Sequence, residues 1–196
     1  MRLLLKNADV PDFVSGFIDD QDELLKHRTV LIKLHRFRSD IAAKADIVLT
    51  SHRDLRDVVA SAHRKFQTKF STLTVNDWVK HYIKWTQYAV YDMHYEQLLV
   101  DRLAELKRVA SVLQLPQKTL DRLPYEAILR EVEGEKFVRQ VSEGTPHDTV
   151  NLLHKDHITD GRHGSWKNVV PEEFIVAIEK EFRGWLMHRG YSVSHS

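Results

Sequence analysis

Short apolar runs alternate with amphipathic segments along most of this chain. Runs rich in branched and aromatic residues predict strands over residues 30–35, 46–51 and 89–94. Apolar residues at helical spacing predict helices over residues 17–27, 54–70, 74–87, 96–114, 117–142 and 171–189. Strands separated by helices favour an α/β fold with a parallel sheet flanked by helices. The length of 196 residues fits a single domain over 1–196.

Charge is balanced over the whole chain, with 29 Lys and Arg against 28 Asp and Glu. Such a balance lacks the broad cationic surface that binds nucleic acid nonspecifically, so we expect no nucleic-acid partner. Basic residues concentrate locally, over residues 26–38 and 53–69. This local clustering is typical of a site for one small polyanionic ligand.

The chain contains no cysteine. Disulfides, zinc–thiolate sites and cysteine nucleophiles are therefore excluded, and a reducing, cytoplasmic location fits. The apolar run Leu3 to Leu5 is too short to span a membrane, so we expect no membrane association. His154, His157 and His163 lie in a polar connection over residues 143–170, but they match no zinc spacing, and we expect no metal. A connection of that length in a compact domain is usually functional.

The segment from Asp46 to Ser61 predicts a buried strand that turns directly into a helix, with Arg53 at the turn. A helix N-terminus beside a guanidinium is a suitable anion site. Ser61 lies two turns further on, about 12 Å along the helix axis. The alternative is structural, with Arg53 paired to Asp57 and Ser61 serving only as a small packing residue.

Lys33 and His35 alternate along the predicted strand 30–35 and should share one face of it. A cation beside an imidazole suits a transfer reaction, because a histidine can accept a proton and a lysine can stabilise developing charge.

These segments resemble, in order, the sulfotransferases that use 3′-phosphoadenosine-5′-phosphosulfate (PAPS). The strand–helix with Arg53, the Asp57-Val58 pair and Ser61 is similar to that family's 3′-phosphate-binding segment. Residues 29–35 resemble its Lys-Thr-His strand. The resemblance implies that Arg53 and Ser61 hold the 3′-phosphate.

The resemblance also implies a reaction centre at the strand 29–35, with His35 as general base and Lys33 next to the bridging oxygen. Residues 92–99 resemble the family's Tyr-Glu-Asp-Leu segment, which implies that Tyr95 lies near the adenine.

The loop from His157 to Asn168 resembles the family's basic-glycine loop followed by Gly-Asp-Trp-Lys. It implies that Gly161, Arg162 and Gly164 close over the nucleotide. Arg162 follows the first glycine rather than preceding it, an arrangement that looks more like bacterial members.

The resemblance covers residues 29–191 and lacks the family's opening strand and glycine-rich loop, which cradles the 5′-phosphosulfate. We therefore expect a sulfotransferase-like fold of the P-loop nucleotide-binding superfamily, apparently N-terminally truncated. Leu3 to Leu5 could replace the lost strand, or a second copy of the chain could cover the open edge as a homo-oligomer.

The expected function is transfer of a sulfuryl group from PAPS, as co-substrate, to a hydroxyl or amine of a small-molecule or glycan acceptor. The alternatives are a non-catalytic nucleotide-binding or interaction protein derived from a sulfotransferase, and a fragment of a longer enzyme.

Overall fold

The computed structural model describes residues 1–17, 24–135, 147–148, 153–154 and 161–194. Two pairs of parallel strands form its centre. In the first, β1 (Phe13–Phe17) pairs with β2 (Thr29–Lys33), and in the second, β3 (Val48–His52) pairs with β4 (Ala89–His94). The remaining described strands are a short antiparallel pair, β5 (His147–Asp148) and β6 (Leu153–His154).

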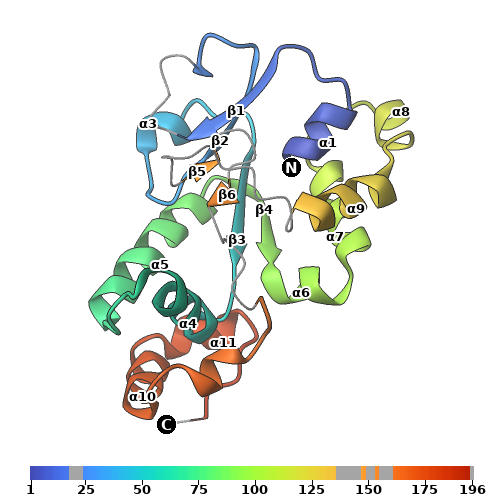
Figure 1. Ribbon diagram of the computed structural model, residues 1–196. Coiled ribbons are helices and arrows are strands. Elements are labelled where there is room, and N and C mark those ends of the chain that lie inside the picture. Colours follow the sequence, from blue (N-terminus) through green and yellow to red (C-terminus); the bar gives the residue numbers. More distant parts are fainter. Residues whose placement is uncertain (18–23, 136–146, 149–152, 155–160, 195–196) are drawn as a thin grey trace.

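Helices lie on both sides of β3 and β4 (Figure 1). One side carries α4 (Leu55–Phe66), α5 (Thr72–Thr86), α10 (Glu172–Glu181) and α11 (Arg183–His188). The other carries α1 (Arg2–Asn7), α6 (Tyr95–Val100), α7 (Arg102–Ser111), α8 (Gln117–Leu120) and α9 (Tyr125–Glu135). A single turn, α3 (Ser39–Ala42), follows β2, and a 3₁₀ turn, η2 (Ser165–Asn168), precedes α10. The predicted α/β class with parallel strands flanked by helices is confirmed.

Two apolar cores correspond to these two sides. One joins α4 and α5 to α10 and α11, through buried residues such as Val59, Val75 and Ile178. The other joins α1 to α7 and α9, through residues such as Leu4 and Ile128. The second core also includes half-buried strand residues, Phe13, Leu31 and Leu49, and the residues of β2, β3 and β4 are half-buried or exposed.

The first thirty residues differ from the prediction. Phe17 belongs to β1 rather than to a helix, while residues 18–23 of the predicted helix 17–27 lie outside the described part of the chain. Leu3 to Leu5 form part of α1 and are buried in the second core, so their prediction as a replacement strand is wrong. Instead β1 supplies a parallel neighbour for β2, and the expectation that no strand precedes residue 29 is also wrong.

Breaks in the helices also differ from the prediction. The predicted helix 96–114 is interrupted at Asp101, whose extended backbone ends α6 and whose side chain caps α7. The described part of the predicted helix 117–142 is two helices, because Pro124 follows α8 and has no N–H for a continuous ladder. Phe182 separates α10 from α11.

Candidate nucleotide-binding site

The site begins where β3 ends and α4 starts. Asp54 caps α4 by accepting a 2.9 Å hydrogen bond from the Arg56 amide, and it is buried. Arg53 lies between this cap and His52, the last residue of β3, and its side chain is only 14% exposed. A short strand leading into a capped helix therefore holds the guanidinium at the carboxyl end of a parallel strand, where ligands of α/β folds usually bind.

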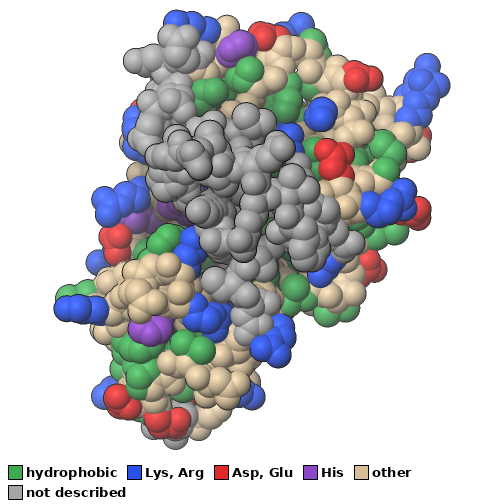
Figure 2. Space-filling model, in the orientation of Figure 1, with side chains coloured by type: hydrophobic (Ala, Val, Ile, Leu, Met, Phe, Trp, Pro, Cys, Tyr) green, Lys and Arg blue, Asp and Glu red, His purple; other side chains and the backbone are tan. Residues whose placement is uncertain are grey.

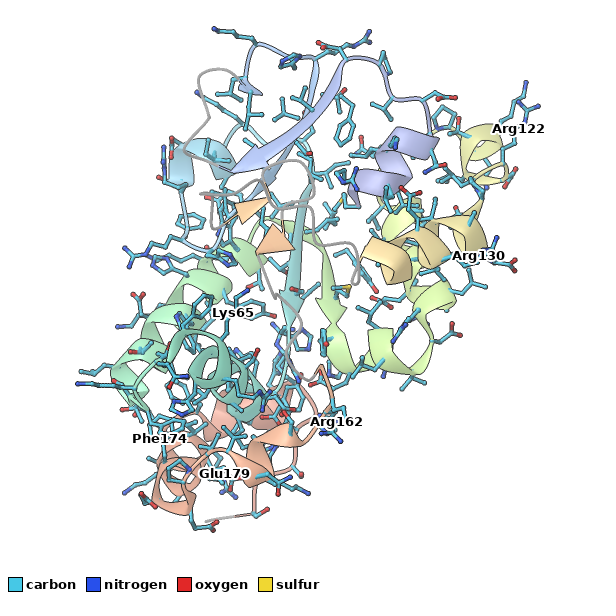
Figure 3. The ribbon with its side chains drawn as sticks, viewed as in Figure 1. Lys65, Arg122, Arg130, Arg162, Phe174 and Glu179 are labelled. Carbon is cyan, nitrogen blue, oxygen red and sulfur yellow. The ribbon has the colours of Figure 1, made fainter. Side chains whose placement is uncertain are left out.

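Arg53 brings together residues that are far apart in the sequence. Its Nη2 donates a 2.6 Å hydrogen bond to the carbonyl of Arg162, and its guanidinium carbon lies 4.5 Å from the centroid of the Tyr95 ring. The Tyr95 hydroxyl donates a 3.0 Å hydrogen bond to the carbonyl of Gly161. Figure 3 shows Arg162 in this loop. Four predicted site residues are therefore in contact.

Arg53 also retains a donor for a ligand. Its Nε is buried and has no hydrogen-bond partner among the described residues. The predicted pairing with Asp57 is loose, since 3.8 Å separates Arg53 Nη2 from Asp57 Oδ2. This distance is beyond that of a hydrogen bond, so the Arg53–Asp57 ion pair of the structural alternative is present without using the Nε donor of Arg53.

Asp57 fixes the glycine loop against α4. This carboxylate is fully buried and accepts hydrogen bonds from the Gly164 amide at 2.8 Å, the Ser165 hydroxyl at 3.0 Å and the Trp166 amide at 3.0 Å. Gly164 has a φ of +76°, in the left-handed region that favours glycine. The sequence indicated Asp57 as an acid near a helix start, as a possible partner of Arg53 and as part of the family-like Asp57-Val58 pair. Its role in holding a loop 107 residues away could not be predicted from helix patterning alone.

Ser61 and His35 are less closely joined to this cluster. Ser61 is half-buried on α4, eight residues after Arg53. β2 ends at Lys33, and His35 lies in the following bend with its side chain exposed. The prediction that His35 is part of the strand is therefore wrong.

Lys33 lies at the end of β2 and is half-buried. Burial lowers its pKa, and the charge of Lys65 on α4 lowers it further. In the view of Figure 3, Lys65 lies between α5 and β3. Two lysines whose charges act on one another provide positive potential for an anionic group beside β2.

A second polar cluster, which was not predicted, lies at the ends of β3 and β4. The Asp92 carboxylate contacts His52 Nδ1 at 3.0 Å, the Tyr82 hydroxyl at 2.5 Å and Arg189 Nη1 at 2.5 Å. The His52 ring stacks on His94 with 4.7 Å between centroids. Burial alone would raise the pKa of Asp92, but the hydrogen bonds that it accepts outweigh burial and lower it. In the sequence, this cluster was indicated only by polar residues at alternate positions near the ends of two apolar strands.

A third group combines two acids with a histidine. His163 Nδ1 lies 3.5 Å from both Asp57 Oδ2 and Glu96 Oε1. One possible ligand atom from each of the three residues lies within 4.8 Å of the other two. Within the described part of the chain, this group could hold a metal ion. Of the other histidines in the predicted polar connection, the side chain of His154 and the whole of residue 157 lie outside the part of the chain that the structure describes.

The arrangement can bind a phosphorylated nucleotide. It offers a guanidinium with an uncommitted N–H, a helix N-terminus and an aromatic ring, all next to a glycine-containing loop. Figure 2 shows Lys and Arg side chains distributed among acids on one face of the molecule rather than gathered in one large patch. Arg53 at the start of α4, and Lys33 with Lys65 near β2, supply positive charge locally, which suits a small anion.

Two comparisons with known proteins found a match. The family model described as sulfotransferase domain matches residues 33–190. The chain is also similar to the crystal structure of mouse sulfotransferase SULT7A1 complexed with PAP. That alignment has a TM-score of 0.64 and 13% identity, and it covers 93% of this chain and 77% of the mouse chain. No curated protein matches the sequence.

The fold and the matched residues define the class: this protein belongs to the sulfotransferase domain family. The matched region includes every predicted site residue, from Lys33 to Gly164. Among the described residues, no helix combines the length and the hydropathy needed to cross a bilayer.

Proposed function

We propose that this protein binds PAPS and transfers its sulfuryl group to a hydroxyl or amine acceptor. The observation that carries the proposal is the convergence of Arg53, Tyr95 and the Gly161 to Gly164 loop, with the buried Arg53 Nε available for a phosphate oxygen. Arg53 and Ser61 bind the 3′-phosphate in this proposal, Tyr95 lies against the adenine, and Arg162 with both glycines closes over the nucleotide.

In the transfer step, the acceptor oxygen or nitrogen forms a bond to sulfur while the bond from sulfur to the bridging oxygen breaks. His35 accepts the acceptor's proton, and 3′-phosphoadenosine-5′-phosphate (PAP) leaves. Lys33 stabilises the negative charge that develops on the departing phosphate. Its lowered pKa reflects a partly desolvated position, in which a charge interacts more strongly than in water.

Binding of PAP tests the nucleotide site. We expect calorimetry to show that PAP binds and that 5′-AMP, which lacks the 3′-phosphate, binds much more weakly. A charge-assisted hydrogen bond contributes about 1.5–3 kcal/mol, so Arg53→Ala should weaken PAP binding about 10- to 150-fold. Arg122→Ala is the matched control, because Arg122 is exposed and lies far from Arg162 in Figure 3. Equal affinity for the two nucleotides, or an unchanged Arg53→Ala, would refute the site.

A non-catalytic nucleotide-binding protein is the second candidate. The observation that favours it is the exposed His35, which lies beyond the end of β2. If His35 is the general base, His35→Ala should lower kcat about 10²- to 10⁴-fold with little change in PAP affinity. Tight PAP binding without measurable transfer to phenolic, alcoholic or amine acceptors supports the non-catalytic function instead.

A further inference from the structure

We infer that Asp57, Glu96 and His163 form a binding site for one divalent metal ion of the zinc type. The three residues come from three separate elements: α4, α6 and the loop before η2. The inference extends the proposed function, because the site lies directly beside the nucleotide anchor Arg53.

The distances within the group are longer than hydrogen bonds and match the separations between neighbouring ligands of a metal. A direct hydrogen bond from an imidazole to a carboxylate has a length of about 2.7–3.2 Å. His163 Nδ1 instead lies 3.5 Å from both carboxylate oxygens. In a tetrahedral zinc site with bonds of about 2.0–2.1 Å, neighbouring ligand atoms are separated by about 3.4 Å. Two observed separations therefore match two edges of such a tetrahedron.

Hydrogen bonds from outside the group orient both carboxylates. Asp57 Oδ2 accepts from the Gly164 amide at 2.8 Å, and Glu96 Oε1 accepts from the Asp54 amide at 3.1 Å. The other oxygen of Glu96 accepts from the Tyr191 hydroxyl at 3.0 Å. Supporting hydrogen bonds of this kind hold metal-binding carboxylates in place in protein sites.

Charge and access are also suitable. Asp57 and Glu96 are buried or nearly so, at 0% and 14% side-chain exposure, whereas the His163 side chain is 55% exposed. A metal ion can therefore approach from the histidine side. Arg53 Nη2 lies 3.8 Å from Asp57 Oδ2, and His94 Nε2 lies 2.9 Å from Glu96 Oε2. Two carboxylates against one guanidinium leave a net negative charge. A dication completes this balance and leaves its fourth position for water or a phosphate oxygen of the nucleotide.

Calorimetric titration of the full chain with Zn²⁺, after treatment with a chelator, tests the inference. We expect one equivalent to bind, and His163→Ala and Glu96→Gln each to weaken binding at least about 10-fold. His188→Ala is the matched control, since His188 is an exposed histidine on α11. Circular dichroism of each variant verifies that it is folded. Absence of Zn²⁺ binding, or binding that survives both His163→Ala and Glu96→Gln, overturns the site.

A second measurement separates this inference from the proposed function. If a phosphate oxygen takes the fourth position, Zn²⁺ should raise PAP affinity, and PAP should raise Zn²⁺ affinity by the same factor. If water takes it, the two affinities are independent. Repeating the measurement with 5′-AMP shows whether the coupling needs the 3′-phosphate. Binding of PAP in excess EDTA without any binding of Zn²⁺ would refute the metal site alone, whereas Zn²⁺ binding without PAP binding would refute the nucleotide site alone.

Discussion

Removing the charge of Arg56 should destabilise this protein more than any other single change in the ion-pair network at the start of α4. The guanidinium is 3% exposed and binds both oxygens of Asp54, at 2.9 and 2.7 Å. It also donates a short hydrogen bond to Glu179 of α10, and it lies 4.5 Å from the centroid of the Trp166 ring. Figure 3 shows Glu179 on α10, below α4.

The magnitude follows from what the substitution leaves behind. Burial alone would lower the pKa of Arg56, but its hydrogen bonds to Asp54 and Glu179 outweigh burial and raise it. Arg56→Met would leave two buried carboxylates without their cation. Breaking a buried ion pair in this way costs about 3–5 kcal/mol. At about 2–4 °C per kcal/mol for a chain of this length, the melting temperature should fall by roughly 6–20 °C.

Glu179→Gln provides the informative contrast. The amide keeps the shape of the side chain and can still accept a hydrogen bond from Arg56, whose charge remains balanced by Asp54. We expect a loss of about 1 kcal/mol, the difference between a charge-assisted and a neutral hydrogen bond. The Arg38–Asp40 pair is a surface control, since both side chains are more than 40% exposed, and Arg38→Met should leave the unfolding midpoint unchanged.

Urea unfolding monitored by circular dichroism measures the free energy of unfolding of all three variants. The comparison is valid if the slope of this free energy against urea concentration is the same for each variant. The reasoning is wrong if Arg56→Met loses less free energy of unfolding than Glu179→Gln. It is also wrong if Arg38→Met is as damaging as Arg56→Met.

Further predictions concern acid stability and two glycines. The pKa of Asp92 is lowered from 3.8 in the folded protein. Its contribution to stability is therefore complete above about pH 5 and is lost as the pH falls toward the pKa of the folded protein. Asp92→Asn should make the melting temperature fall less between pH 7 and pH 3 than it does in the unchanged protein. Gly16→Ala would place a Cβ 2.6 Å from Leu24 Cδ1 and should lower the free energy of unfolding by about 1–3 kcal/mol. Gly184→Ala meets no atom within 4 Å and lies in α11, so it should raise that free energy by about 0.5–1 kcal/mol; equal effects at both glycines would contradict the argument.

The sequence predicted elements best where local pattern decides structure. The predicted strand 89–94 is β4 residue for residue, and α5 differs from its prediction by one or two residues at each end. The strand β1 was missed because five residues containing Ser15 and Gly16 carry little strand signal. Glycine is favoured at position 16 because a Cβ there would lie 2.6 Å from Cδ1 of Leu24. Such a contact is visible only in three dimensions.

The site was predictable in part. Arg53, Tyr95, Gly161 and Arg162 were expected together because of the family resemblance, and the structure brings them into contact. The buried Asp57 contacts, and the networks around Asp92 and Arg56, could not be foreseen because each joins segments that are distant in the sequence. Periodicity reports which face of a helix is buried, but it does not report which remote donor a buried carboxylate meets.

The hydrogen bond from Arg53 to the carbonyl of Arg162 spans 109 residues, and it has a consequence for protein synthesis. A ribosome that adds about 5–20 residues per second completes the second segment roughly 5–20 s after the first. During that interval the nascent chain carries Arg53 and Asp57 without the loop that holds them in the finished protein. This contact therefore forms only after most of the chain has been translated.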